Sequence, residues 1–415
     1  MTAASHQVEV INSPRLPVLE RRPDLDWIRV IAFGVLIFFH AAVAFMPHAI
    51  PMTVNAVPSP TMMVFVAFLH QFRLSLLFLV SGMGICFALR RRSTREFLLN
   101  RMHRLVVPLI FGVLVLVPPM VWMEKRYAGQ FQGSLLDLYF ELFTHGVYPH
   151  GHLSWHHFWF VAYLFLMCGL LVPFVNWLRT PNGERFFSYR LAKMVPGAAI
   201  YWMILPLVVV ELLLRVWFPG FRDLLHDWAS FSHWFLVLLA GYGLASHAPL
   251  FDRIKALAWI SVVLACSCSV LMFQLFYDPS TGDLAPMQSS LPLWLGYLIY
   301  CVLGMTNVWC WLLACTGLAL RFLTRGGPIL NYLNDAVYPL FCLHLPVMVA
   351  WETVLLPLDW PVLIKYCALT GATLVTTLLF HHVVVRHSAF LSRMLGRQFE
   401  TRRESRVAAP GRTNQ

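Results

Sequence analysis

Residues 28–46 read IRVIAFGVLIFFHAAVAFM, and this stretch decides the fold class of the chain. Only two of its residues, Arg29 and His40, are ionisable. A helix of about 20 apolar residues is long enough to cross the hydrocarbon core of a bilayer. The stretch therefore predicts a transmembrane α-helix.

The same kind of stretch recurs along the whole chain. Of the 415 residues, 59% are hydrophobic and 12% are charged, and the mean hydropathy is +0.66; a soluble domain carries about 25% charged residues. Ten apolar stretches are long enough to cross a bilayer, and they cover residues 28–46, 62–89, 104–123, 154–176, 197–217, 230–248, 254–276, 291–319, 331–356 and 361–386. We therefore expect an all-α, polytopic integral membrane protein with about ten transmembrane helices.

The basic residues predict how these helices are oriented, because Lys and Arg collect in cytoplasmic loops. With the N-terminus inside, 24 of the 31 Lys and Arg residues lie in the N-terminal segment, the tail and alternate loops, and three lie in outer loops. Both termini are therefore expected in the cytoplasm. The formal net charge of +11 fits loops that face anionic lipid, so we expect no nucleic-acid partner.

The sequence divides into one membrane domain and two polar ends. Residues 1–26 form a cytoplasmic segment that lacks the apolar core of a signal peptide. Residues 27–387 form the ten-helix domain, and residues 388–415 form a basic cytoplasmic tail that we expect to be disordered. All nine cysteines fall within predicted spans, so we expect no disulfide in an outer loop.

Arg29 and His40 are the first candidates for chemistry. Eleven residues separate them, which is three helical turns to within about 20°, so both side chains share one face about 16 Å apart along the helix. Ionisable residues inside a membrane helix are costly unless they line a cavity or meet a partner, and they favour a functional site. A hydrogen bond between helices is the structural alternative for His40.

A second basic pair precedes the third predicted span. Arg101 and Arg104 are three residues apart, so they share a face of a helix that enters the membrane from the inside. Paired guanidinium groups suit phosphate, because each can donate two parallel hydrogen bonds. The alternative is that these arginines, like Arg90 to Arg92, only set the topology.

Other polar residues lie in or beside the predicted spans. Arg73 in the second span can orient a carboxylate or stabilise an oxyanion, or it can form a structural ion pair with an acid such as Glu211 or Glu352. His157 and Trp159 begin the fourth span at the outer face, where they suit either a sugar or the interfacial aromatic belt.

Two further polar residues lie in the ninth span. Tyr338 and His344 are six residues apart, so they do not share a helix face unless Pro339 or Pro346 distorts the helix. His344 can support a neighbouring group or make a contact between helices.

Five histidines fall within 13 residues before and at the start of the fourth span, at positions 145, 150, 152, 156 and 157. Their spacing matches no compact zinc ligand set, and no carboxylate lies between them. We therefore expect no metal site.

Several short motifs occur in a fixed order along the chain. They are Arg29 with His40, Phe72-Arg73, Ser81-Gly82, Arg101-Met102-His103-Arg104, His157-Phe158-Trp159-Phe160 and Tyr338-Pro339 with His344. Together they resemble the membrane acyltransferase-3 family, most closely its branch of periplasmic-glucan succinyltransferases, over nearly all of residues 24–386. The chain departs from that branch at Leu74-Ser75-Leu76 and at Asn334-Asp335.

The resemblance implies an O-acyltransferase of the bacterial inner membrane. Such an enzyme moves an acyl group from cytoplasmic acyl-CoA, here acetyl-CoA or succinyl-CoA, to a hydroxyl of an extracytoplasmic carbohydrate. On this interpretation Arg29, Arg101 and Arg104 bind the donor phosphates, and His40 is the general base. Arg73 assists catalysis.

The remaining candidate residues are assigned to acceptor binding. On the same interpretation His157, Trp159, Tyr338 and His344 contact the carbohydrate. No Gly-x-Ser-x-Gly motif is present, which favours direct transfer over a seryl intermediate. The acyl group, the acceptor and the oligomeric state are not specified by the sequence.

Two other functions have to be weighed against an acyltransferase. A secondary transporter also places ionisable residues in the membrane, but interrupted helices in matching halves are not evident in the sequence. A membrane scaffold gives no reason for an arginine and a histidine on one helix face together with an inner arginine pair.

Overall fold

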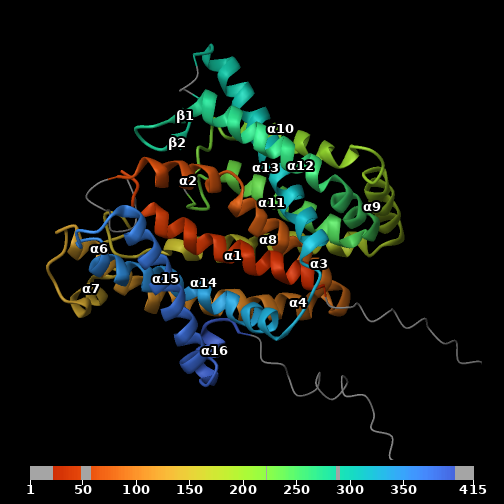
Figure 1. Cartoon of the computed structure of the whole chain (residues 1–415). Helices are drawn as coiled ribbons and strands as arrows, with labels where there is room; N and C mark the ends of the chain where they lie inside the picture. The colour runs from red at the N-terminus through yellow and green to blue at the C-terminus, as the bar shows by residue number, and fades with distance from the viewer. Residues whose placement is uncertain (1–21, 48–57, 221, 287–289, 398–415) are drawn as a thin grey trace, which may run out of the picture.

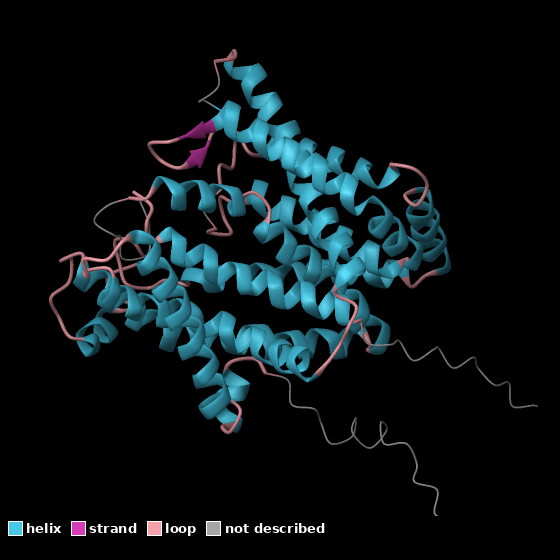
Figure 2. Cartoon of the chain, viewed as in Figure 1, coloured by secondary structure: helices cyan, strands magenta, loops and turns pink. Residues whose placement is uncertain are grey.

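Helices make up nearly all of the structure. The computed structural model describes residues 22–47, 58–220, 222–286 and 290–397 (Figures 1 and 2). Residues 1–21 and 398–415, which make up most of the two predicted polar ends, lie outside the described residues. The predicted all-α fold class is confirmed.

The elements follow one another as a chain of membrane-length helices and short connecting helices. The α-helices are α1 (Pro23–Val43), α2 (Pro60–His70), α3 (Arg73–Arg91), α4 (Thr94–Arg101), α5 (Val107–Phe111), α6 (Val117–Tyr127), α7 (Leu135–Glu141), α8 (Trp159–Leu178), α9 (Pro181–Lys193), α10 (Ile204–Leu214), α11 (Trp228–Ser246), α12 (Ala248–Phe276), α13 (Leu293–Phe322), α14 (Pro328–Leu355), α15 (Val362–Phe380) and α16 (Ala389–Met394). Two-residue strands, β1 (Tyr277–Asp278) and β2 (Asp283–Leu284), pair antiparallel in the connection between α12 and α13.

Nine helical segments in the described part of the chain are long and apolar enough to cross a membrane. They correspond to nine of the ten predicted spans. The exception is the predicted span 197–217, which forms the shorter apolar helix Ala199–Leu214.

The position of α1 beside α14 bears on whether this short helix crosses the membrane. Arg29 of α1 is hydrogen-bonded to Asn334 of α14, and His40 lies beside His344, so the two helices run in the same direction. If each of the nine longer segments crosses once, α14 runs parallel to α1 only when Ala199–Leu214 crosses as well. This arrangement fits ten crossings.

Helix α1 lies near the middle of the bundle, with α14 along one side of it (Figure 1). It also contacts α2, α3, α13 and α15. Pro23 occupies its first turn together with Asp24 and Asp26, which suits a helix start because the amide groups there are unpaired and the dipole favours negative charge. The central position of α1 brings its polar residues against several other helices.

Helices α3 and α11 pack with their backbones in close approach. A Cβ atom on Gly82 would overlap the carbonyl oxygen of Leu238, and one on Gly241 would overlap that of Leu79. Small residues allow membrane helices to pack this closely. The Ser81-Gly82 motif therefore has a structural reason in this fold.

The third membrane segment, Thr94–Tyr127, is one continuous helical run that contains two π-helical turns, Met102–Val106 and Gly112–Leu116. The first turn precedes Pro108, which has no amide hydrogen to offer the preceding turn. A capping box between Ser93 and Glu96 starts the run. Arg101 and Arg104 lie early in this run, at the end of α4 and in the first π-helical turn.

The predicted disordered tail begins with an ordered element. Helix α16 follows Ser388, whose side chain accepts a hydrogen bond from the amide of Leu391. Just beyond it, Arg397 pairs with Asp335 of α14 at 2.9 Å. Residues 388–397 therefore pack against the membrane domain.

Candidate active site

Two histidines on the parallel helices α1 and α14 face one another. Nδ1 of His40 lies 3.1 Å from Nε2 of His344, and the two rings stack with centroids 5.2 Å apart. His344 is fully buried, whereas His40 is partly exposed. The pair thus has one fully buried member and one member that keeps some exposed surface.

The partners of His344 determine which nitrogen of His40 is free. Nδ1 of His344 lies 2.7 Å from the carbonyl oxygen of Phe341, which only accepts hydrogen bonds, so this nitrogen carries the hydrogen. In the neutral ring, Nε2 of His344 then accepts a hydrogen bond from Nδ1 of His40. His40 is left with a lone pair on Nε2, to which no described residue is hydrogen-bonded.

His157 joins the pair from the 3₁₀ turn His156–Phe158, which leads into α8. Its Nε2 donates to the carbonyl oxygen of Cys342 at 3.2 Å, and its ring lies edge-on to His344 with centroids 5.2 Å apart. The carbonyl of Cys342 is available because Pro346, four residues later, has no amide hydrogen to bond it. Nδ1 of His157 is buried, with no hydrogen-bond partner in the described structure. The site therefore contains three histidines from three helices.

Arg73 is buried beside the site. Its guanidinium carbon lies 3.4 Å from the centroid of the Phe39 ring, next to His40 in the sequence. A cation over an aromatic face is favourable, and Nε of Arg73 has no hydrogen-bond partner among the described residues. Glu211, one of the two acids suggested from the sequence, is instead bound by Arg215 and His233.

That second polar cluster connects three helices and was not predicted. Glu211 and Arg215 form a bidentate pair at 2.8 and 2.9 Å, and His233 bridges between Glu211 and Ser75. Arg215 also donates to Ser230 at 2.8 Å. The spacing of four residues between Glu211 and Arg215 was the available signal, because such residues are neighbours on one helix.

The predicted basic cluster lies at the opposite end of α1. Arg29 donates to Asn334 of α14 at 3.1 Å and lies 3.5 Å from Asp26. The positive charges of Arg101 and Arg29 both act on Arg104, so the three arginines lie in one region of the structure. No carboxylate in the described ranges is paired with Arg101 or Arg104. Such a cluster has the charge to bind a polyanion.

The structure separates Tyr338 from His344. Tyr338 lies on the side of Arg101 and Arg104, with its ring against Gly396 and its hydroxyl buried without a partner in the described structure. His344 lies with His40, six residues or about 9 Å further along α14. The two residues predicted to share one role are thus at different depths.

Trp159 is buried and does not lie on the open outer rim. Its ring packs against Trp234 and Tyr163, with centroids 5.0 and 5.2 Å away. The guanidinium of Arg222, from the connection between α10 and α11, lies over it at 4.9 Å. Trp159 therefore packs inside the bundle, beneath a cation.

The arrangement combines an anion-binding cluster at one end of α1 with a hydrogen-bonded histidine pair near its other end. No curated protein and no solved structure matches the chain significantly. The family model described as an acyltransferase domain, that of the acyltransferase-3 family, matches residues 22–382 and so spans nearly the whole chain. The chain therefore belongs to the acyltransferase-3 family and is a membrane acyltransferase.

Proposed function

We propose that the protein moves an acetyl or succinyl group from cytoplasmic acyl-CoA to a hydroxyl of an extracytoplasmic carbohydrate. It would act in a bacterial inner membrane with both termini in the cytoplasm. The distribution of Lys and Arg supports this orientation. The single observation that carries the proposal is the pair His40–His344, because it leaves Nε2 of a partly exposed histidine free to accept a proton.

The donor binds at the basic cluster. Coenzyme A carries several phosphate charges on one end and a long, thin thiol-bearing arm on the other. Arg29, Arg101 and Arg104 bind the phosphates, and Asn334 and Asp26 hold the side chain of Arg29. About 16 Å of helix separates Arg29 from His40, a distance that the arm can follow through the bundle.

The reaction is a direct transfer. The acceptor oxygen attacks the thioester carbon while Nε2 of His40 takes the hydroxyl proton, and the carbon–sulfur bond then breaks. The departing thiolate receives that proton, so the products are an oxygen ester and free coenzyme A. His344 holds the ring and tautomer of His40, and the guanidinium of Arg73 stabilises the oxyanion.

The acceptor enters from the outer face. The guanidinium of Arg222, an exposed residue, lies over the ring of Trp159 and offers a polar contact to a sugar, while the buried side chains of His157 and Trp159 support the acceptor side from within. Tyr338, which the sequence assigned to the acceptor, lies nearer the arginine cluster, so we reassign it to the donor side. Secondary transport is not supported by any contact in this site.

The experiment is acyl transfer in proteoliposomes that contain the purified protein. Radiolabelled acetyl-CoA or succinyl-CoA is supplied on the side of the basic loops, and glucan oligosaccharides are supplied on the other side. The proposal predicts labelled oligosaccharide ester and an equal amount of free coenzyme A. Coenzyme A release without ester, at every acceptor tried, would contradict a carbohydrate acceptor.

A further inference from the structure

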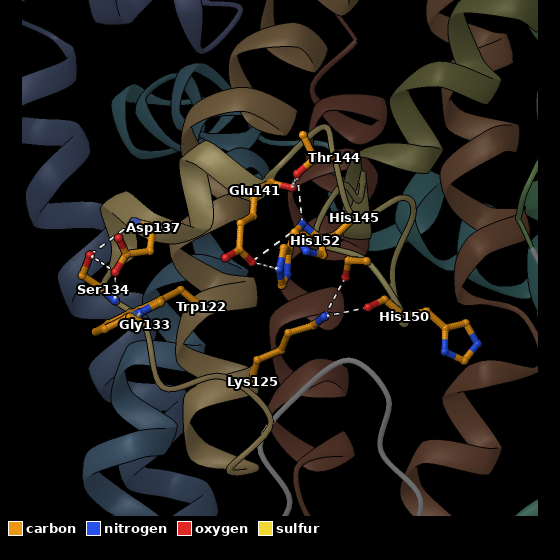
Figure 3. A network of polar contacts seen from close by, with 11 residues as sticks. Trp122, Lys125, Gly133, Ser134, Asp137, Glu141, Thr144, His145, His150 and His152 are labelled. Carbon is orange, nitrogen blue, oxygen red and sulfur yellow. Dashed lines mark hydrogen bonds and ion pairs between the residues drawn. The ribbon is translucent and has the colours of Figure 1, made fainter.

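Three potential metal ligands converge in the connection between α6 and α8, away from the histidine pair. They are an oxygen of Glu141 and one ring nitrogen each of His145 and His152, and all three atoms lie within 4.8 Å of one another (Figure 3). Glu141 ends the short helix α7, and His145 follows one turn later. His152 arrives from the loop that leads to α8.

The distances suit tetrahedral coordination. Oε2 of Glu141 lies 3.1 Å from Nε2 of His152 and 3.8 Å from Nδ1 of His145. Ligand atoms about 2.0–2.2 Å from a zinc ion in tetrahedral geometry are about 3.3 Å apart. Small side-chain movements would therefore place one ion among all three atoms.

The surroundings hold His152 in place. Lys125 donates to the carbonyl oxygen of Gly151 at 2.7 Å and to that of His150 at 3.3 Å, which fixes the backbone beside His152. The ring of Phe131 lies edge-on to His152 at 5.3 Å. His152 is buried, and its side chain cannot turn away without losing the contact with Phe131.

The same cluster is open to a metal on its other side. The side chains of Glu141 and His145 are 38% and 56% exposed, so an ion can enter and a water can occupy a fourth position. The hydroxyl of Thr144 lies 3.0 Å from Nδ1 of His145 and would have to give up that contact. The ammonium group of Lys125 is turned to the backbone carbonyl groups of His150 and Gly151.

We propose that Glu141, His145 and His152 bind one divalent transition-metal ion of the zinc type. Two imidazoles and one carboxylate form a ligand set that suits zinc. The expectation of no metal rested on the spacing of the histidines and on the lack of a carboxylate between them, and it missed Glu141, which lies four residues before His145. Bound metal ties α7 to the loop that continues to His156 and His157, and so stabilises the outer side of the acyltransferase site.

The test is metal binding by the purified, full-length protein without a histidine tag, after removal of metal with a chelator. Zn²⁺ titration followed by calorimetry should give one site. Co²⁺ should give the visible absorption of a tetrahedral nitrogen and oxygen complex. Each of the variants His152→Ala and Glu141→Gln should weaken binding by at least about 100-fold.

The loop supplies a matched control in His150→Ala. Its side chain makes no contact in the cluster and only its carbonyl is used, so the affinity should stay within about twofold of wild type. Equal Zn²⁺ affinity in wild type, His152→Ala and Glu141→Gln would overturn the proposal. A Co²⁺ spectrum with sulfur charge-transfer bands would also overturn it, because it would point to the exposed thiols of Cys266 and Cys367.

Discussion

Nδ1 of His40 lies 3.1 Å from Nε2 of His344, and the far nitrogen of His344 is fixed by the carbonyl of Phe341. This chain of two hydrogen bonds specifies one neutral tautomer for each ring. It resembles the way in which a general base in other enzymes is oriented by a neighbouring group. The two helices that carry the pair, α1 and α14, run parallel and are also joined by the hydrogen bond between Arg29 and Asn334.

Replacing His344 tests whether it positions His40. In His344→Ala, we expect kcat to fall by about 100-fold, while the KM for acyl-CoA stays near the wild-type value, because the base loses its tautomer but the donor cluster is intact. The measurement is steady-state transfer together with the pH dependence of kcat, whose lower limb should move. A change confined to protein stability, with kcat and its pH dependence unaltered, would assign His344 a purely structural role.

The basic cluster predicts a phosphate-dependent effect. The double variant Arg101→Gln/Arg104→Gln should raise the KM for acyl-CoA, because two charge-assisted contacts are lost. Removing the 3′-phosphate from the donor should then raise this KM by a smaller factor in the variant than in wild type. Arg95→Gln is the control, since Arg95 is exposed on the same inner helix. An equal increase of KM in variant and wild type would mean that Arg101 and Arg104 only set the topology.

The contact between α3 and α11 predicts a packing effect. Gly82→Leu should lower the denaturation midpoint in detergent, at a cost of about 1–3 kcal/mol or more, because its side chain meets the backbone of Leu238. Gly34→Ala is the control for replacing a helical glycine, since a Cβ there meets nothing within 4 Å. An unchanged midpoint for Gly82→Leu would contradict the described approach of the two helices.

Much of this site was predictable from periodicity. Arg29 and His40 were expected on one helix face because 11 residues bring a helix back to nearly the same direction. The partners could not be predicted in this way. His344 and Asn334 are about 300 residues away from them in sequence, and only the packing of α14 on α1 brings them into contact.

The sequence placed His157 and Trp159 at an outer rim, and the structure places both in the interior. Pro346 frees a carbonyl that binds His157, which therefore lies against α14 and is not on the open rim. Trp159 is likewise covered by its aromatic neighbours. The predicted span 197–217 is the one that forms a shorter helix, Ala199–Leu214, and the direction of α14 fits a crossing there.

The orientation of the chain can be measured by cysteine labelling. Arg95→Cys and Gln132→Cys both introduce a thiol at an exposed position outside the apolar core of the bundle. A membrane-impermeant reagent should label Gln132→Cys in intact cells and Arg95→Cys only after permeabilisation. The wild type is the control, because all nine native cysteines lie within helices. Labelling of both variants in intact cells would contradict a cytoplasmic N-terminus.

The central claim is that His40 is the base, and the most direct test is the rate of transfer by His40→Gln in the proteoliposome assay. Glutamine keeps a hydrogen bond to His344 but cannot take the proton, so we predict that kcat falls by at least about 100-fold with folding and acyl-CoA binding preserved. His387→Gln, at an exposed histidine outside the site, should be as active as wild type. Retention of most of the wild-type kcat by folded His40→Gln would contradict the mechanism.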